Sequence, residues 1–330
     1  MKTILILTNK EDVTVDFVVR ELQRRKISYY RLNTEDIPDK ISVNFDLNNN
    51  MFELNDKVKD ININLLNFDS VYYRRPLLNE LNYIEKINLQ EVNYLRSELG
   101  FILEGIYKIL RNKYWLNNVY NIREAENKIY QLQVAQEIGF KIPMSVISNQ
   151  NEEVNKVIED CNNDCIIKPI KSGNMKDKNC PKAVFTTKLD KSKFNNINQI
   201  ESFPLFIQNN IHKQFDLRIT VIGEYVFAAQ IHSQNNRDSE IDWRRGRKIL
   251  EHKNHELPVK IRKMCIELTQ KMNLNYSAID MVLDKDGNYV FLEINPNGQW
   301  AWIEKRLGFP LSEKIVDLLI GKEKCNVEKY

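Results

Sequence analysis

The stretch SAIDMVLDKDGNYVFLEINPN, residues 277–297, decides the fold. It predicts a β-hairpin, because Asp286-Gly287 is a strong signal for a type I′ turn, in which both central residues need positive φ. One side of this hairpin would be wholly apolar and would suit a core. The apolar pairs expected on that side are Ile279 with Ile294, Met281 with Leu292, and Leu283 with Val290.

The other side of the same hairpin places Asp280 opposite Glu293, with Asn295 two residues further along the same face. Carboxylates directly across a ladder lie about 5 Å apart at Cβ, and they repel each other when no cation is near. Mg²⁺ takes one or two carboxylates together with waters and nucleotide phosphates. We interpret the three side chains as Mg²⁺ ligands, and an exposed acidic face on an edge hairpin is the alternative.

A lysine within an apolar strand is a second indication of a nucleotide site. Lys168 lies in the run CIIKPI, residues 165–170, where a charged side chain on a half-buried strand needs a partner. A nucleotide phosphate would be a suitable partner, whereas a lysine that extends its amine into solvent is the alternative. The polar residues 172–181 that follow predict a loop long enough to cover phosphates as a lid.

Residues 206–211, FIQNNI, form an apolar strand that turns polar at its end. This pattern is expected where the backbone meets the edge of an adenine ring and Ile211 covers the ring. By itself the pattern is a weak signal.

A second hairpin is predicted over residues 216–229, with Gly223 in a type II′ turn. Arg218 would then lie opposite Ala229, whose small side chain leaves room for a guanidinium. An arginine in this place could hold a γ-phosphate or an acyl phosphate. A structural ion pair with Asp216 is the alternative.

The chain as a whole predicts an α/β protein with α+β lobes, and its 330 residues allow two or three packed units. Three domains are expected, over residues 1–120, 121–212 and 213–330. Strands are expected at Thr3–Leu7, Tyr29–Leu32, Ser42–Leu47, Met51–Leu54, Ser70–Tyr73, Met144–Ile147, Asp164–Ile170, Ala183–Thr187 and Leu205–Ile211. A first helix is expected from the apolar pattern of Val15, Val18, Val19 and Leu22. Further helices are expected over 80–112, from Ile129 to a cap at Gly139, near 152–160, and at 258–272 and 310–320.

These segments occur in the order that ATP-grasp enzymes use, and the chain resembles that family over nearly its whole length. The segment LEINPNGQWAWIE, residues 292–304, is more particularly similar to the peptide maturases of the microviridin type, the graspetide synthetases. The segments DWRRG at 242–246 and YRRP at 73–76 also resemble that group. The resemblance implies a three-part ATP-grasp fold with an N-terminal pre-ATP-grasp domain, a small central lobe and a C-terminal antiparallel-sheet lobe.

The resemblance also implies ATP and Mg²⁺ as cofactors, with two ions expected, and ester or amide crosslinking of a precursor peptide that carries a leader and an acidic core. Asn209 stands where a glutamate is usual, although an amide oxygen can still accept a hydrogen bond from the adenine amino group. By matching position, the residues implied are Lys128 and Lys168 for phosphates, Gln208, Asn209 and Ile211 for adenine, and Asp280, Glu293 and Asn295 for metal.

Arginines are expected to receive the acidic side chains of such a substrate, because a guanidinium binds a carboxylate through two parallel hydrogen bonds. We assign Arg218 and Arg244 to catalysis, and Arg74, Arg75 and Arg245 to substrate binding. For Arg74-Arg75 and Arg244-Arg245, a solvated or structural arginine is an equally good interpretation.

Bulk composition excludes several classes of function. No apolar run reaches the roughly 18–20 residues of a spanning helix, and the N-terminal stretch turns charged too soon for a signal peptide, so a cytoplasmic location and no membrane partner are expected. Five scattered cysteines indicate neither a zinc site nor a disulfide framework. The net charge of +3 without a basic block argues against nucleic acid.

Two alternatives to a peptide macrocyclase stay open at this stage. One is a glutathione-synthetase-like ligase that joins free amino acids or adds them to a protein tail. The other is a nucleotide-binding regulator without turnover, against which the set of Arg218, Asp280, Glu293 and Asn295 argues. The oligomeric state is also open, and a homodimer is one arrangement that we consider.

Overall fold

The computed structural model describes residues 2–85, 87–171, 173–175, 182–189, 202–245 and 250–322. None of the helices in these ranges is long and apolar enough to cross a bilayer. The described residues form two compact units, each treated separately below. The N unit comprises Met1–Arg123, Asn273–Tyr276 and Pro296–Tyr330, and the central unit comprises Glu124–Met272 and Ser277–Asn295. The break near residue 123 lies close to the predicted boundary at 120, and the remaining boundaries stay a prediction.

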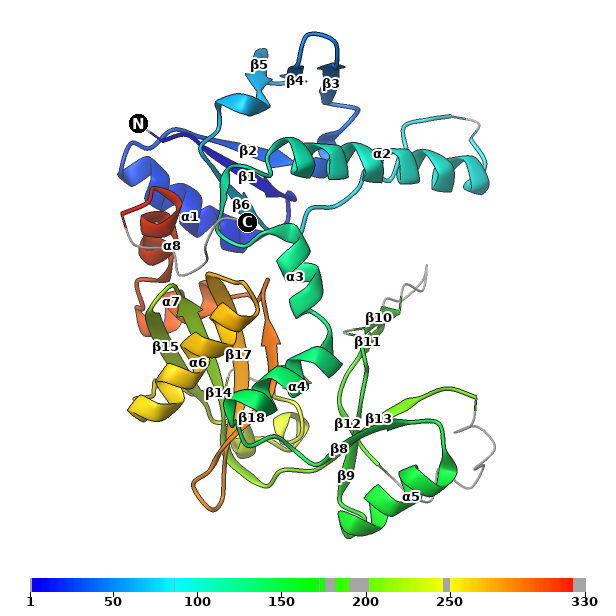
Figure 1. Ribbon diagram of the computed structural model, residues 1–330, viewed down its shortest axis with the longest axis vertical. Helices are drawn as coiled ribbons and strands as arrows, with labels where there is room; N and C mark the ends of the chain where they lie inside the picture. The colour runs from blue at the N-terminus through cyan, green and yellow to red at the C-terminus, as the bar shows by residue number, and fades with distance from the viewer. Residues whose placement is uncertain are drawn as a thin grey trace. The chain divides into compact units, whose positions relative to one another are not determined.

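The N unit is built on a parallel sheet with the strand order β2-β1-β6-β7 (Figure 1). All five residues of β1 are buried, as expected for a strand in a sheet covered on both faces. The strands are β1 (Ile4–Thr8), β2 (Tyr29–Asn33), β6 (Ser70–Tyr73) and β7 (Tyr114–Trp115). The helices of this unit are α1 (Val13–Arg24), α2 (Leu89–Ile109), α3 (Val119–Ala125), α7 (Ala301–Leu307) and α8 (Leu311–Leu319).

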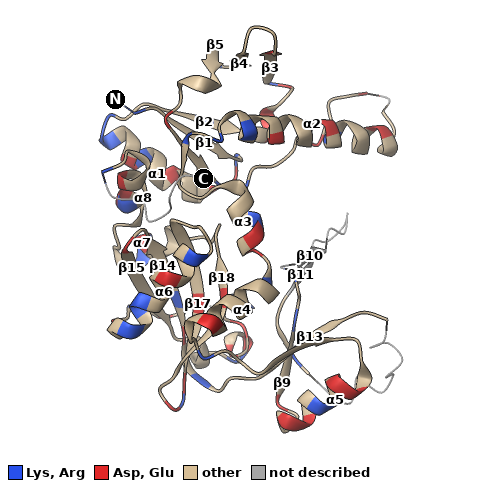
Figure 2. Ribbon diagram, viewed as in Figure 1, with Lys and Arg blue, Asp and Glu red and all other residues tan. Residues whose placement is uncertain are grey.

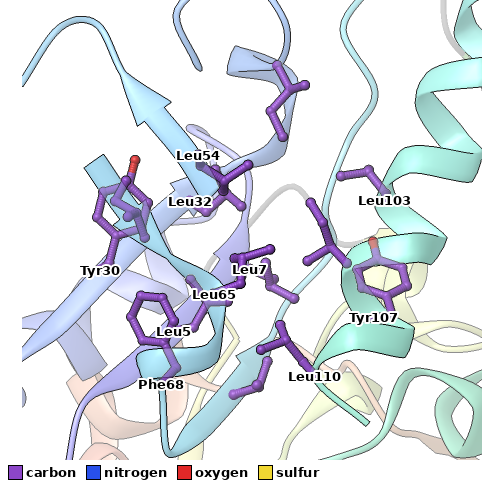
Figure 3. Packing of buried hydrophobic residues seen from close by; sticks show 14 of the residues in the cluster. Leu5, Leu7, Tyr30, Leu32, Leu54, Leu65, Phe68, Leu103, Tyr107 and Leu110 are labelled. Atoms are coloured by element: carbon purple, nitrogen blue, oxygen red, sulfur yellow. The ribbon is translucent and has the colours of Figure 1, made fainter. Parts of the chain in front are cut away.

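A small antiparallel sheet packs over one part of the N unit. Its strands are β3 (Ile41–Asp46), β4 (Met51–Asp56) and β5 (Ile61–Asn64), of which the sequence did not predict the last. Leucines of this sheet, of the parallel sheet and of α2 meet in one hydrophobic core (Figure 3). The core residues labelled there include Leu5, Leu7, Leu32, Leu54, Leu65, Phe68, Leu103 and Leu110.

The C-terminal helices pack on the same unit, although they follow the predicted metal hairpin in sequence. Helix α8 contacts α1 and β6, and the Ser70 hydroxyl donates to the Leu319 carbonyl at 2.6 Å. Arg25, the C-cap of α1, forms an ion pair with Asp317 on α8. Helix α8 confirms the prediction over 310–320, whereas α7 was not predicted.

The central unit contains a four-stranded sheet with the order β12-β9-β13-β8 and helix α5 packed on it (Figure 1). Buried Val154 and Ile158 of α5 contact Ile207 of β13, which forms the small core of this sheet. The elements are α4 (Lys128–Ile138), β8 (Ser145–Ser148), α5 (Asn151–Asp160), β9 (Cys165–Lys168), β12 (Thr187–Lys188) and β13 (Leu205–Asn209). Helix α4 ends at Gly139, whose φ of +95° fits the predicted cap.

The predicted lid loop is in part a hairpin. Strands β10 (Gly173–Met175) and β11 (Lys182–Val184) pair antiparallel. The other residues of the predicted loop, 172 and 176–181, lie outside the described part of the chain.

A five-stranded sheet with the order β16-β15-β14-β17-β18 forms the rest of the central unit, together with helix α6 (Val259–Lys271). Its strands are β14 (Lys213–Ile222), β15 (Tyr225–Ile231), β16 (His252–Asn254), β17 (Tyr276–Asp284) and β18 (Tyr289–Asn295). Helix α5 is mainly acidic, with Lys156 as its one basic residue, whereas α6 is mainly basic, with Glu267 as its one acidic residue (Figure 2).

The β17–β18 hairpin confirms one half of the predicted register and corrects the other. Ile279 pairs with Ile294, and Asp280 pairs with Glu293, as predicted. The turn is not type I′, because only Gly287 has positive φ, at +83°. The loop is one residue longer, and a β-bulge between Asp280 and Met281 restores the register.

The bulge changes the partners of the outer apolar residues. Met281 pairs with Phe291 and not with Leu292, and Leu283 pairs with Tyr289 and not with Val290. The prediction for these two pairs was therefore wrong. The β14–β15 hairpin, by contrast, has Arg218 opposite Ala229 as predicted, and Gly223 takes a φ of +56°.

Candidate active site

A cavity of about 290 Å³ lies within the central unit. Its walls come from β9, β13, β14, β17 and β18, from the start of α4 and from residues 241–244. Among the predicted site residues, it brings together Lys128, Lys168, Gln208, Asn209, Ile211, Arg244, Asp280, Glu293 and Asn295.

Asp280 is buried and lies against an arginine of the neighbouring strand. Nη1 of Arg218 donates to both carboxylate oxygens of Asp280 at 2.8 Å. Asp216, the alternative partner of Arg218, accepts instead from Nζ of Lys213 at 2.8 Å. Burial raises the pKa of Asp280 above its usual value and nearby Glu293 adds to this rise, whereas Arg218 acts in the opposite direction.

Glu293 lies among several cations. Its carboxylate is 3.4 Å from Nζ of Lys128 and 3.6 Å from Nη1 of Arg244. Burial alone would raise the pKa of Glu293, but the positive charges of Lys128, Arg244 and Lys168 outweigh burial and lower the pKa to about 2. Glu293 is therefore ionised at neutral pH and is available as an oxygen ligand.

Lys168 ends β9, where its residue pairs with Phe206 of β13. Burial lowers the pKa of Lys168 to about 8, against the opposing effect of Glu293. An anion that entered the cavity would favour the protonated amine, because an opposite charge stabilises the charged form. This environment fits a phosphate ligand better than an amine extended into solvent.

The hinge strand β13 carries two buried acceptors without partners. Among the described residues, Oε1 of Gln208 and Oδ1 of Asn209 have no hydrogen-bond partner, although Nε2 of Gln208 donates to Oγ of Ser145 at 2.7 Å. Buried polar groups are rarely left unpaired. The two oxygens therefore suit a donor on a bound ligand, such as the amino group of adenine, beside the apolar Ile211 wall.

Leu292 and Asp242 are among the cavity residues that sequence reasoning did not assign to the site. The β-bulge turns Leu292 toward the cavity, so it lines the same space as Glu293. Asp242 belongs to the site because its carboxylate lies 2.9 Å from Nε of Arg244. Burial would lower the pKa of that guanidinium, but the effect of Asp242 is larger and the pKa is raised. The short spacing of Asp242 and Arg244 in the segment DWR, residues 242–244, is a sequence signal that could have indicated their ion pair, whereas the bulge had no local signal.

Two models of known domain families match the chain. The MvdD pre-ATP grasp domain matches residues 3–123, and the RimK-like ATP-grasp domain matches residues 125–319, which is more than half of the chain. The chain belongs to the RimK-like ATP-grasp family. It is thus an ATP-grasp ligase with a mixed α/β ATP-grasp fold. A search of the curated proteins gave no match.

Three solved structures resemble this ATP-grasp ligase along nearly its whole length. The RiPP-associated ATP-grasp ligase of Chryseobacterium gregarium, solved with ADP and a leader and core peptide, is 26% identical over 100% of both chains, with a TM-score of 0.89. Macrocyclase MdnC of Microcystis aeruginosa MRC, bound with precursor peptide MdnA, is 26% identical over 97% of this chain and 100% of that chain, with a TM-score of 0.84. Macrocyclase MdnB of the same organism is 25% identical over 97% of this chain and 99% of that chain, with a TM-score of 0.79.

The donor set of the ATP-grasp site fits Mg²⁺. Within the described ranges, no group of three or more His, Cys, Asp or Glu residues could hold a metal alone. Two carboxylates from Asp280 and Glu293 with the Asn295 amide form an oxygen set that nucleotide phosphates and waters would complete. A carboxylate offers about four lone-pair sites, so Asp280 can keep Arg218 and still bind a cation.

Arg74 does not have the role predicted from the sequence. Its side chain is 1% exposed, Nε lies 3.0 Å from Asp12, and Nη1 donates to the Gly298 carbonyl at 3.0 Å, all within the N unit. A buried guanidinium engaged in this way has no surface for a substrate carboxylate, so its role is structural.

Arg75 is exposed, and its backbone takes a φ of +47°.

Arg245 has a looser environment than Arg244. Its guanidinium lies over the Phe185 ring at 5.7 Å, and Nη1 donates to the Thr186 carbonyl at 3.4 Å. Substrate binding by Arg75 and Arg245 stays a prediction.

Replacing Glu293 by glutamine separates the metal from the nucleotide. We expect Glu293→Gln to lower Mg²⁺-dependent ADP formation at least about a hundredfold, because loss of one metal ligand removes several kcal/mol of transition-state stabilisation. Metal-free ATP binding, measured by calorimetry, should stay equal or become tighter, because Lys128, Lys168 and Arg244 lose a competing counter-charge.

The matched control is Glu267→Gln on α6, where the carboxylate is 51% exposed and pairs with Lys271 at 3.7 Å. It should behave like the wild-type protein in both measurements. Full turnover of Glu293→Gln would refute the assignment of this hairpin as the metal site.

Proposed function

We propose that this ATP-grasp ligase is a macrocyclase that acts on a ribosomally made precursor peptide. The observation that carries the proposal is the pairing of Asp280 with Glu293 in a cavity that also holds Lys128 and Lys168, within a chain that resembles MdnC and the C. gregarium ligase along nearly its full length. Both of those proteins were solved with a peptide bound. By analogy, we propose a substrate peptide with a leader and an acidic core.

In the proposed reaction, MgATP supplies the phosphoryl group that converts a peptide Asp or Glu carboxylate into an acyl phosphate, with release of ADP. A Ser, Thr or Lys side chain then attacks the acyl carbon, phosphate leaves, and an ester or amide crosslink results. Phosphoryl transfer depends mainly on positioning and charge neutralisation. Lys128 and Lys168 would hold phosphate oxygens, and Asp280, Glu293 and Asn295 would hold two Mg²⁺ ions.

Arg218 and Arg244 are assigned to catalysis in this proposal. Arg218 is fixed by Asp280, and Arg244 is fixed by Asp242 while it lies 3.6 Å from Glu293. Both guanidiniums are therefore held in place next to the acidic pair. A preorganised cation stabilises the charge of a transferring phosphoryl or acyl phosphate without reorganisation.

Further parts of the proposal concern organisation and location. We propose that residues 1–120, 121–212 and 213–330 are the three functional parts of the enzyme. We also propose that it acts in the cytoplasm, where the ribosome releases such a peptide, and that it needs neither a membrane nor nucleic acid.

The mass of the precursor peptide tests the proposed reaction. The peptide encoded beside the gene is incubated with the protein, ATP and Mg²⁺, and we expect it to lose the mass of one water for each crosslink formed. Glu293→Gln is the control and should leave the peptide unchanged. An unchanged mass with the wild-type protein would contradict macrocyclisation, and a gain of amino-acid residue masses would favour the glutathione-synthetase-like alternative.

We also propose that the chain forms a homodimer through the exposed face of α2. Tyr94 is 64% and Phe101 is 73% exposed there, and a Cβ on Gly105 would meet no atom within 4 Å. Two α2 helices packed antiparallel would place the aromatic side chains of one copy near the small residues of the other. They would also place Glu91, in the first turn, opposite Lys108, in the last turn.

Light scattering after gel filtration tests this dimer. We expect the wild-type protein to have twice the mass of one chain, and Phe101→Glu to have the mass of one chain, because it buries a charge in the interface. Val259→Glu, at an equally exposed apolar position on α6, should stay dimeric. A monomeric wild-type protein, or a dimeric Phe101→Glu variant, would contradict the proposal.

A further inference from the structure

Gln131 on α4 binds the backbone between two of the metal-site residues. Its side chain is buried, with 3% of the residue exposed. Nε2 donates to the carbonyl of Ile294 at 2.9 Å, and Oε1 accepts from the N–H of Ile294 at 3.1 Å. Nε2 also donates to the carbonyl of Ala125 at 2.7 Å. Both donors of this amide are therefore in use, and so is its oxygen.

The position of β18 explains why such an amide is needed. It is the last strand of its sheet, and in the described part of the chain its outer backbone edge meets no further strand, only an isolated bridge from Lys141 to Val290. Buried backbone groups without a partner cost free energy. Gln131 supplies one donor and one acceptor to the outer edge at Ile294, as one residue of an additional strand would. Further along, the Phe291 N–H donates to the Lys141 carbonyl at 2.8 Å.

Ile294 is the residue between Glu293 and Asn295, and it points into the core, with 2% exposed. Side chains alternate along a strand, so its two neighbours point together toward the cavity. The β-bulge lies directly before this segment, because Asp280 pairs with Glu293 and Met281 pairs with Phe291, which leaves Leu292 of β18 as the extra residue. A bulge disrupts the ladder locally, so fixing the backbone just beyond it matters for the direction of both ligands.

The same helix also carries Lys128, one turn before Gln131. Residues three apart lie on one face of a helix. Nζ of Lys128 is 3.1 Å from the Pro169 carbonyl and 3.4 Å from Glu293. One face of α4 therefore contacts both the backbone and a side chain of the metal-bearing strand, and α4 and β18 pack together within the central unit.

We propose that Gln131 is a positioning residue, whose side-chain amide fixes the β18 backbone at Ile294 and thereby sets the geometry of Glu293 and Asn295 toward the metal and toward Lys128. This inference rests on the proposed ATP-grasp function of the site, and it concerns metal binding within that function. Gln131 itself is not among the residues that line the cavity. Residues of this kind, which orient the ligands of a metal, typically change metal affinity about 10–100-fold when removed.

The test is a titration with Mn²⁺, followed by electron paramagnetic resonance, in the presence of a non-hydrolysable ATP analogue. Gln131→Met keeps the length and volume of the side chain and removes all three hydrogen bonds. We expect it to weaken Mn²⁺ binding to the nucleotide complex at least about tenfold. Binding of the nucleotide without metal should stay within about twofold, because the lysines and the hinge strand are unchanged.

Gln133→Met is the matched control, since Gln133 is exposed on the same helix and its Nε2 donates to the Glu137 carboxylate at 3.3 Å. It should leave both affinities unchanged. Gln131→Glu is a second variant in case Gln131→Met does not fold, because it keeps the acceptor for the Ile294 N–H. Gln131→Glu should also weaken Mn²⁺ binding, because it places a carboxylate oxygen, in the position of Nε2, against the carbonyl oxygens of Ile294 and Ala125, and these atoms repel each other.

A purely structural role would lower the thermal stability of these variants without separating the two affinities. Wild-type Mn²⁺ affinity in a folded Gln131→Met or Gln131→Glu variant would overturn the proposal. The titration contains no peptide. A result against Gln131 therefore leaves the proposed macrocyclisation intact, and failure of macrocyclisation leaves the Gln131 result intact.

Discussion

The structure of the site depends on one electrostatic constraint, the pairing of Asp280 with Glu293 across two neighbouring strands in a buried place. Two like charges directly opposite each other on a ladder destabilise a sheet. The chain compensates with cations from several elements of the central unit. Arg218 takes Asp280, while Lys128 and Arg244 approach Glu293. The same cations would receive the phosphates of a nucleotide, so one arrangement serves both the stability of the acidic pair and the binding of a nucleotide.

Much of this arrangement could be predicted from the sequence, because strand alternation and turn chemistry are local. Gly223 determined the turn that places Arg218 opposite Ala229. The pairing of Asp280 with Glu293 was also predicted, but through two errors that cancel. The turn is one residue longer than predicted, with Gly287 alone at positive φ, and the bulge returns the strands to register. A bulge depends on packing around the strand, which periodicity does not report.

Other parts depend on partners far away in the sequence and could not be predicted. Arg74 ends a strand next to a second arginine, which suggested a binding role, yet its partners are Asp12 and the carbonyl of Gly298. Gln131 gave no signal at all, because the group that it binds is 163 residues away. For both residues, only the tertiary structure shows which buried polar groups need a partner.

The location of the metal in the nucleotide complex tests the central claim most directly. Crystals of the protein grown with Mn²⁺ and a non-hydrolysable ATP analogue would show the metal by its anomalous scattering. We expect a peak within about 2.5 Å of oxygen atoms of Asp280, Glu293 and Asn295. A peak bound by other residues, with Asp280 still held only by Arg218, would contradict it.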